Sequence, residues 1–128
     1  MKLLEVNSIE LPNDVDKECV KLCNVLNRLP GVYTWESCCG HLEHPYWIWF
    51  KCNNIGSLSR LGRSVNKNYS NGKWEIVVET NDTSPYGFFW LRTKEAFKTY
   101  EEMMDDIDNL IDSILYWFDD KFDEHFSK

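Results

Sequence analysis

The C-terminal part of the chain carries the strongest periodic pattern in the sequence. Between residues 94 and 120, apolar residues recur at alternating spacings of three and four, and a second apolar row runs beside the first. This spacing places both rows on one wide face of an α-helix, which needs a sheet or another subunit to pack on. The two rows are Phe97, Tyr100, Met104, Ile107, Ile111, Ile114 and Phe118, and Ala96, Met103, Leu110 and Trp117.

The length of this segment raises a question about its partners. A helix over 94–120 would be about 40 Å long at 1.5 Å per residue. A single domain of this size is roughly 30 Å across. We therefore expect the helix to contribute to a homo-oligomer contact, and a break in the helix is the alternative.

Two further helices are expected before it. Residues 14–29 carry apolar side chains at helical spacing, with Asn13 or Asp14 as the N-cap and Pro30-Gly31 as the end. Cys19 and Cys23 lie on the apolar face of this helix, so they are read as small core residues. A short helix follows residue 57, with Ser57 as its cap and Leu58, Leu61 and Val65 toward the core.

Four alternating segments predict two hairpins. They cover residues 32–39 and 46–52, joined by 40–45, and residues 73–80 and 88–93, with Asn71-Gly72 as a turn before the second pair. Residues 3–6 are a candidate edge strand. The order α-ββ-α-ββ-α predicts a single α+β domain over residues 1–128, with an antiparallel sheet covered by helices and a long C-terminal helix.

Composition limits the class of protein. No apolar run is long enough to span a membrane, and the N-terminus lacks the apolar core of a signal peptide. Five cysteines at uneven spacing indicate reduced thiols, so we expect a cytoplasmic protein without membrane partners.

Charge is distributed unevenly along the 128 residues. Residues 94–128 hold eleven acidic residues against four lysines, which accounts for the net charge of −7, whereas residues 51–73 hold five basic residues and no acidic one. The acidic tail argues against binding to long nucleic acid. The basic segment can still receive a small anion.

The stretch WESCCGHLEHPYWIWF, residues 35–50, has the residue types of a zinc site. However, neighbouring strand residues point to opposite faces, which separates Cys38 from Cys39, and Cys52 falls far along the paired strand. We therefore expect no cofactor, and Cys39, His41 and His44 remain the ligand set if zinc binds. For a thiol enzyme, the candidates are Cys38 or Cys39 as the nucleophile, His41 as the base and Glu36 to orient it.

A ligand pocket is the third interpretation. Arg60 and Arg63 share one face of the short helix, close to the Ser57 helix start, and arginine suits phosphate oxygens. Aromatic residues nearby can stack on a base, among them Trp35, Trp49 and Phe89. The predicted ligand-binding residues are Glu36, Ser37, His41, Trp47, Arg60, Arg63 and Trp90.

The block of residues 29–41, LPGVYTWESCCGH, followed by Pro45-Tyr-Trp-Ile-Trp-Phe50, resembles a group of small phage and prophage proteins of low-GC bacteria. Trp74-Glu-Ile-Val-Val78 and Ser84-Pro85 resemble later elements of that group, whereas Leu42-Glu43-His44 stands where Gly-Lys is usual. Residues 37–41 are also distantly similar to the Ser-Cys-Ser-Gly-Arg block of the wybutosine-synthesis methyltransferase family.

The phage resemblance implies an accessory role in the bacterial host cytoplasm, such as sequestering a nucleotide immune signal. The leading hypothesis is thus a non-enzymatic protein that binds a small phosphate-bearing, nucleotide-type ligand. One alternative is an inhibitor that binds a host defence protein through acidic residues of the long helix, namely Asp105, Asp108 and Asp112. The other alternative is a zinc- or thiol-dependent enzyme that uses the residue 36–44 hairpin.

Overall fold

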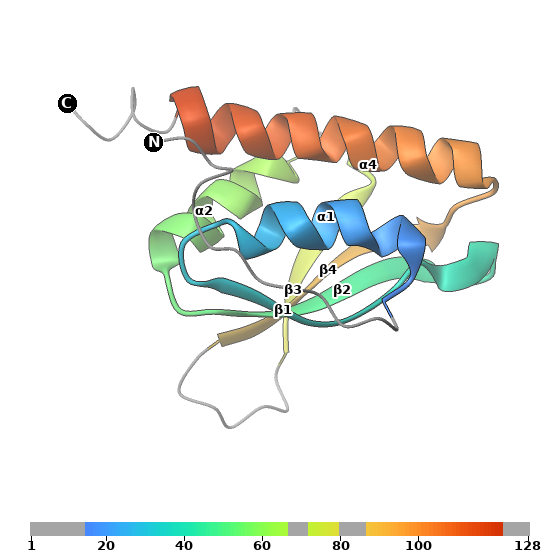
Figure 1. The fold of residues 1–128 in the computed structure, drawn as a ribbon, viewed down its shortest axis with the longest axis horizontal. Helices are drawn as coiled ribbons and strands as arrows, with labels where there is room; N and C mark the ends of the chain where they lie inside the picture. Colours follow the sequence, from blue (N-terminus) through green and yellow to red (C-terminus); the bar gives the residue numbers. More distant parts are fainter. Residues whose placement is uncertain (1–14, 67–71, 80–86, 122–128) are drawn as a thin grey trace.

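The computed structural model describes residues 15–66, 72–79 and 87–121. Three helices and four strands follow one another in the predicted order α-ββ-α-ββ-α, so the α+β class is confirmed (Figure 1). The predicted edge strand at 3–6 lies outside the described residues. The elements are α1 (Lys17–Asn27), β1 (Val32–Cys38), β2 (Pro45–Cys52), α2 (Ile55–Ser64), β3 (Trp74–Val78), β4 (Gly87–Ala96) and α4 (Tyr100–Leu115).

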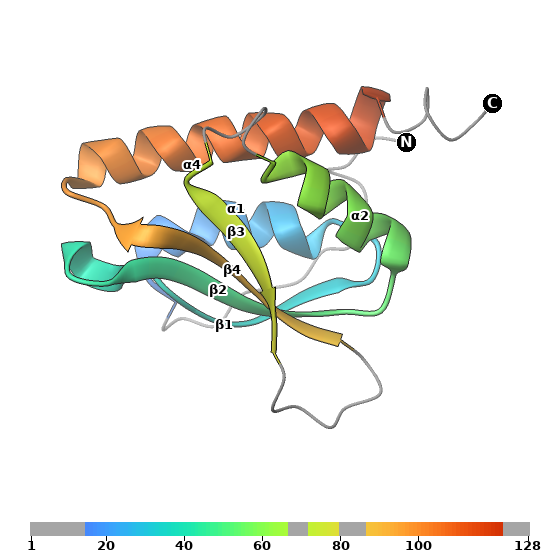
Figure 2. The ribbon, with the colours of Figure 1, turned by 180° about the vertical axis from the view of Figure 1, so that it is seen from behind.

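The four strands form one antiparallel sheet in the order β1-β2-β4-β3. Each hairpin supplies two neighbouring strands, and the two hairpins join through β2 and β4. The helices α1, α2 and α4 all lie on one face of the sheet (Figures 1 and 2). Among the described residues, no helix covers the opposite face, which we call the open face.

Alternation along β2 separates core from open face. Tyr46, Ile48 and Phe50 are fully buried under the helices, whereas Trp47 and Trp49 between them are half-buried on the open face. Each fully buried apolar side chain contributes roughly 1.5–3 kcal/mol. The core also takes apolar residues from β4 and from all three helices, including Leu22, Leu26, Leu61, Leu91, Met103, Ile107, Leu110 and Ile114.

The first two helices begin at other residues than predicted. The segment expected over 14–29 forms α1 over Lys17–Asn27, after an N-cap at Asp16; Asn13 and Asp14 lie outside the described residues. For α2, the prediction that Ser57 is the cap is wrong. The Asn54 side chain accepts a hydrogen bond from the Ser57 N–H, and the buried Ser57 hydroxyl donates to the Pro30 carbonyl instead.

The last helix is shorter than the predicted 94–120. β4 continues to Ala96, Thr99 caps α4 through the Glu102 N–H, and a π-helical turn, η3 (Tyr116–Lys121), follows Leu115. Sixteen residues span only about 24 Å. The apolar face of α4 packs into the protein's own core. The length of the helix therefore gives no argument for an oligomer.

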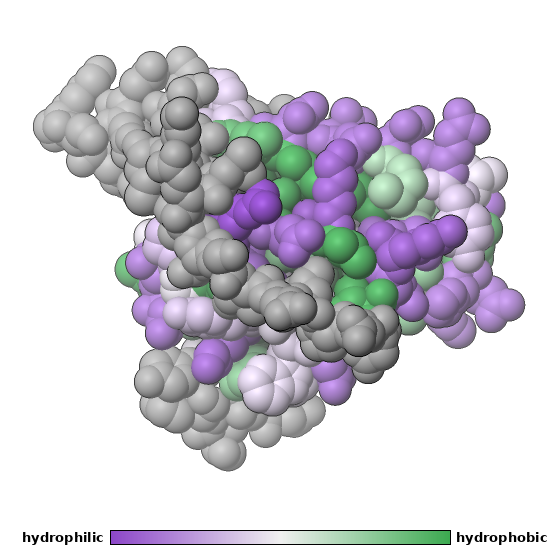
Figure 3. All heavy atoms as spheres, in the orientation of Figure 1, coloured by the Kyte–Doolittle hydropathy of each residue, from purple (hydrophilic) through white to green (hydrophobic). Residues whose placement is uncertain are grey.

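The acidic face of α4 is turned outward. Asp105, Asp108 and Asp112 are exposed, and Asp108 pairs with Lys21 of α1. Figure 3 shows hydrophilic residues along this helix at the upper edge of the molecule. Asp106 is buried instead, and its carboxylate accepts a 2.8 Å hydrogen bond from Lys73, which ties the approach to β3 to the helix layer. None of the described helices is long and apolar enough to cross a membrane.

Candidate functional site

A continuous row of aromatic rings crosses the open face. Trp35 and Phe88 contact Trp49, Trp49 stacks on Trp90 with ring centroids 5.7 Å apart, and Trp90 meets the edge of Trp47 at 5.2 Å. These five residues are called the aromatic row. The row forms because paired residues on neighbouring strands project to the same face, and Trp49 is paired with Trp90.

A groove lies at the end of the aromatic row formed by Trp47 and Trp90. It encloses about 330 Å³, within the range of small-ligand sites. Arg92 and Lys94 bring two positive charges to it, and the Glu75 carboxylate accepts a 2.8 Å hydrogen bond from Arg92 Nε. The groove is lined by His44, Pro45, Trp47, Glu75, Trp90, Arg92, Thr93 and Lys94.

A bulge in β1 sets the position of Trp35 at the other end of the row. The register shifts between Thr34 and Glu36, so Trp35 is the extra residue and its side chain is 60% exposed. The buried Asn27 side chain accepts from the Thr34 N–H and donates to the Thr34 hydroxyl, each at 2.8 Å. The end of α1 thereby holds the bulge in place.

The structure divides the predicted ligand-binding residues between two faces of the sheet. Trp47 and Trp90 line the groove, and Glu36 is exposed on the same face, opposite Trp49. Ser37 is paired with the buried Ile48, so it lies on the helix-covered face. Phe89, predicted to stack on a base, is a core residue stacked on Phe50.

The two predicted phosphate-binding arginines lie in the helix layer. The Arg60 guanidinium lies 5.0 Å from the centre of the Phe118 ring, and the Arg63 guanidinium lies 5.2 Å from Trp117. Both therefore pack α2 against η3 by cation–π contacts. The sheet separates them from any ligand that lies on Trp47 and Trp90.

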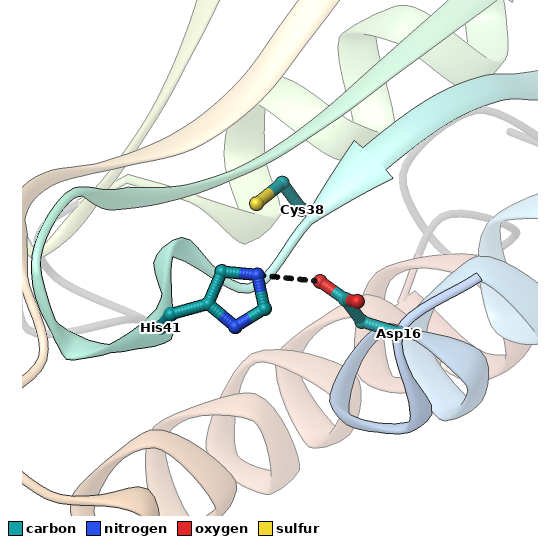
Figure 4. Close-up of side chains that lie close together, drawn as sticks. All are labelled: Asp16, Cys38 and His41. Carbon is teal, nitrogen blue, oxygen red and sulfur yellow. Dashed lines mark ion pairs between the residues drawn. The ribbon is translucent and has the colours of Figure 1, made fainter. Parts of the chain in front are cut away.

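A second cluster lies where the β1–β2 turn meets the start of α1. One donor atom each from Asp16, Cys38 and His41 lies within 4.8 Å of the others (Figure 4). Asp16 Oδ2 is 3.7 Å from His41 Nε2 and accepts a 3.0 Å hydrogen bond from the Cys39 N–H. On the other side of the ring, His41 Nδ1 is 3.5 Å from Cys39 Sγ.

This cluster corrects the predicted metal and catalytic sets. Asp16 rather than Glu36 lies beside His41, and Cys38 shares the Nε2 side of the ring with Asp16. Cys39 contacts His41 as well, but through the other ring nitrogen, Nδ1. His44 lines the groove instead. Cys52 pairs with Val32 at the far end of β1, which confirms its separation from Cys38 along the strand.

A hollow of about 610 Å³ lies between the starts of α1 and α4. It is lined by Lys17, Glu18, Tyr100 and Met104. Desolvation, together with the nearby Cys39, Glu18 and Asp16 side chains, raises the pKa of Tyr100. Asp16 directly precedes the lining residues Lys17 and Glu18, so the hollow adjoins the end of the cluster formed by Asp16.

The reactivity of the thiols follows from their burial. Desolvation raises the pKa of Cys39 to about 11, and burial also raises the pKa of Cys19, Cys23 and Cys52. A thiol with a pKa near 11 holds about 100-fold less thiolate at neutral pH than one near 9. Cys39 is therefore unsuited to be the predicted nucleophile, and Cys38 is the half-buried cysteine.

Alkylation should distinguish the two adjacent cysteines. In metal-free, reduced protein at pH 8, iodoacetamide is expected to label Cys38 first, and Cys38→Ser should slow labelling more than about 10-fold. Labelling of Cys39 should rise only as the pH approaches 11. Intact mass spectrometry measures both rates, with Cys39→Ser as the matched control. Loss of fast labelling in Cys39→Ser, but not in Cys38→Ser, would reverse the assignment.

Three residues at these sites were not predicted from the sequence. Arg92 and Lys94 alternate with Trp90 on β4, so period-two spacing places them on the face of that tryptophan. This period-two pattern is present in the sequence, but the strand was expected to end at Thr93, which left Lys94 outside it. Asp16 lies 22 positions before Cys38 in the sequence, and no local pattern indicates that contact.

Comparison with known proteins adds no relative. No protein-family model, curated protein or solved structure matches this chain. The resemblance of residues 29–50 to phage proteins therefore stays a prediction.

Proposed function

We propose that the chain is a non-enzymatic binding protein for a small phosphate-bearing ligand with a planar aromatic group, as in a nucleotide. The observation that carries the proposal is the aromatic row, which ends at a groove with two cationic side chains. The base would lie against Trp47 and Trp90, and the phosphate would face Arg92 and Lys94. This places the anion on β4 rather than on α2, where the sequence had suggested it.

The aromatic part of the ligand suits the open face. Stacking of a base on an aromatic side chain contributes roughly 1–3 kcal/mol and needs no particular base. Trp47 and Trp90 already meet edge to face, so a planar group in the groove continues an existing packing pattern. Trp90 is held by a 3.0 Å hydrogen bond from its Nε1 to Glu79, which limits the ordering required on binding.

The charge of the groove suits a small anion. The chain has a net charge of −7, yet Arg92 and Lys94 outnumber the single carboxylate of Glu75 in the groove. Only Nε of Arg92 is used by Glu75, and guanidinium carries further N–H donors for phosphate oxygens. The acidic surface elsewhere disfavours a long polyanion.

Binding alone is sufficient for the sequestering role that the phage resemblance implies. A host immune signal of the nucleotide type has both chemical parts that the groove would accept, a base and phosphate. No reaction is needed to lower the free concentration of such a signal.

Calorimetry with a panel of ligands tests the proposal. The panel contains cyclic nucleotides, cyclic ADP-ribose isomers, the free nucleoside and inorganic phosphate. We expect the phosphate-bearing nucleotides to bind more tightly than the nucleoside. Arg92→Gln and Lys94→Gln should remove that difference, because each deletes a charge that faces the anion.

Arg60→Gln is the matched control, since it removes the same charge on the other side of the sheet. Binding that depends on Arg60 and not on Arg92 would overturn the placement of the site. Absence of binding to every member of the panel would overturn the function. Charge reversal at Asp105, Asp108 and Asp112 then tests the acidic protein-binding alternative.

A further inference from the structure

We propose that Asp16, Cys38 and His41 form a binding site for one zinc-class metal ion, with a fourth position open to water. The three residues come from the start of α1, the end of β1 and the turn that follows β1 (Figure 4). This site is separate from the groove and does not depend on the proposed nucleotide ligand.

The separations of the donor atoms suit a tetrahedral ion. Zinc holds nitrogen and oxygen at about 2.0–2.2 Å and sulfur at about 2.3 Å, so neighbouring ligands in a tetrahedron lie roughly 3.3–3.8 Å apart. His41 Nε2 and Asp16 Oδ2 are 3.7 Å apart, and all three donors lie within 4.8 Å of one another. Contraction of at most about 1–1.5 Å at the thiol therefore brings all three donors to bonding positions around one ion.

The surroundings of His41 favour Nε2 as the ligand. The second ring nitrogen, Nδ1, is 3.5 Å from Cys39 Sγ. Metal-bound histidines usually donate their other N–H to a fixed acceptor, which sets the tautomer and the ring orientation. The Cys39 sulfur lies where it can accept this weak bond from Nδ1–H, which leaves the Nε2 lone pair for the metal.

The backbone of the turn directs the ligands toward one another. Gly40, His41 and Leu42 all have positive φ angles, of 82°, 53° and 66°. This conformation is unfavourable for histidine and leucine, and unfavourable backbone geometry concentrates at functional sites. The Gly40 N–H donates to Cys38 Sγ at 3.4 Å, a contact that helps to fix the position of the sulfur.

Asp16 supplies a second, independent observation. It occupies the N-cap of α1, where aspartate normally accepts a hydrogen bond from its own helix, but it makes no side-chain cap bond. Its carboxylate instead turns to the Cys39 N–H and the His41 ring. Two of the three proposed ligands, Asp16 and His41, therefore already lie side by side, and their contact does not serve to cap α1.

The donor types narrow the metal class. A thiolate and an imidazole select zinc and similar transition metals over magnesium and calcium, which prefer oxygen ligands. Three protein ligands with one open position are typical of zinc sites that keep a bound water. The side chain of His41 is 61% exposed, so solvent reaches the cluster.

Cobalt(II) absorbance tests the site directly. Metal-free full-length protein is prepared with a chelator under a phosphine reductant and titrated with cobalt(II), then with zinc. We expect one equivalent to give thiolate-to-cobalt charge-transfer bands, with d–d bands of tetrahedral intensity, and zinc to displace them. Zinc should also protect Cys38 from iodoacetamide.

Variants identify the ligands. Cys38→Ser should abolish the charge-transfer bands, and Asp16→Asn and His41→Gln should each weaken cobalt binding by more than about 100-fold, beyond what outer partners of ligands contribute. The controls are Cys39→Ser, which should keep the bands and lose at most about 10-fold in affinity, and His44→Gln, which should be unchanged. Circular dichroism is used to check that each variant is folded.

The outcome that overturns the site is defined by the same spectra. Folded protein that gives no thiolate-to-cobalt band at millimolar cobalt has no such site. Bands that survive Cys38→Ser and disappear in Cys39→Ser or His44→Gln would assign the metal to other residues. Neither readout involves nucleotides, so this result is independent of the groove.

Discussion

Replacing Trp90 by alanine is expected to weaken binding of a nucleotide-type ligand by about 10–100-fold, which corresponds to the loss of one stacking contact. Trp90 lines the groove, stacks on Trp49 and meets Trp47, so its removal opens the wall on which the base would lie. Quenching of tryptophan fluorescence and calorimetry measure the affinity. Trp47→Ala should have an effect of the same order, since that ring forms the neighbouring wall.

Trp35→Ala is the matched control for this prediction. Trp35 belongs to the same aromatic row and is 60% exposed, but it lies on the edge strand and does not line the groove. If the ligand is confined to the groove, the Trp35→Ala variant should bind it with an affinity within about twofold of that of the parent protein. Equal losses in the Trp35 and Trp90 variants would show instead that the whole open face binds an extended partner.

A loss of fold must be separated from a loss of binding. Trp90 lies on a central strand, and its Nε1 donates to Glu79, so the alanine variant gives up packing as well as a hydrogen bond. Trp90→Phe keeps an aromatic ring without the N–H donor. We expect it to recover most of the affinity, because stacking needs the ring rather than the donor.

Periodicity predicted the order of the elements because each element buries one face. The alternation of β2 and the three-four spacing of α4 are both local signals. Most of the residues in the two predicted C-terminal rows are buried, whereas Tyr100 is exposed and Ala96 and Met104 are half-buried. Local periodicity did not predict where β4 ends. Residues 94–96 stay in the sheet through the Lys94 N–H bond to Lys73 and the pairing of Ala96 with Pro45. These contacts join segments distant in sequence.

The candidate site was predictable only where strand alternation decided it. Trp47 and Trp49 lie on one face of β2 because period two fixes the side of a strand residue. The pairing that brings Glu36 to that face was not predicted. The side of the sheet on which α2 packs is a property of the whole fold. Arg60 and Arg63 were therefore predicted to join the tryptophans because they are close in the sequence. In the structure they lie in the helix layer, on the other side of the sheet from Trp47 and Trp90.

The second large effect is expected at the turn that both sites share. Gly40 has a φ of +82°, and a Cβ placed on it would lie 2.9 Å from the Pro45 carbonyl oxygen and 3.1 Å from its carbon. Both atoms are backbone, so the turn has to move. Left-handed geometry costs about 1–2 kcal/mol for a residue with a Cβ, and with the contact we expect Gly40→Ala to lower the free energy of unfolding by roughly 2–4 kcal/mol.

Gly62→Ala is the same substitution in a position without either constraint. Gly62 lies within α2, and a Cβ there meets nothing within 4 Å. Alanine should raise the free energy of unfolding by about 0.5–1 kcal/mol, because glycine loses more backbone entropy in a helix. Urea denaturation measures both variants under one set of conditions. A Gly40→Ala protein as stable as the parent would show that the left-handed turn is not required by the fold.

The Gly40 substitution also links the two sites. The Gly40 carbonyl accepts hydrogen bonds from the Glu43 and His44 N–H groups, and the turn carries His41 on one side and the groove residues His44 and Pro45 on the other. A shift that relieves the Pro45 contact displaces all of these. We therefore expect folded Gly40→Ala to bind cobalt(II) and nucleotide more weakly, whereas Gly62→Ala binds both as the parent does. Weakened binding of only one ligand would show that the turn holds a single site.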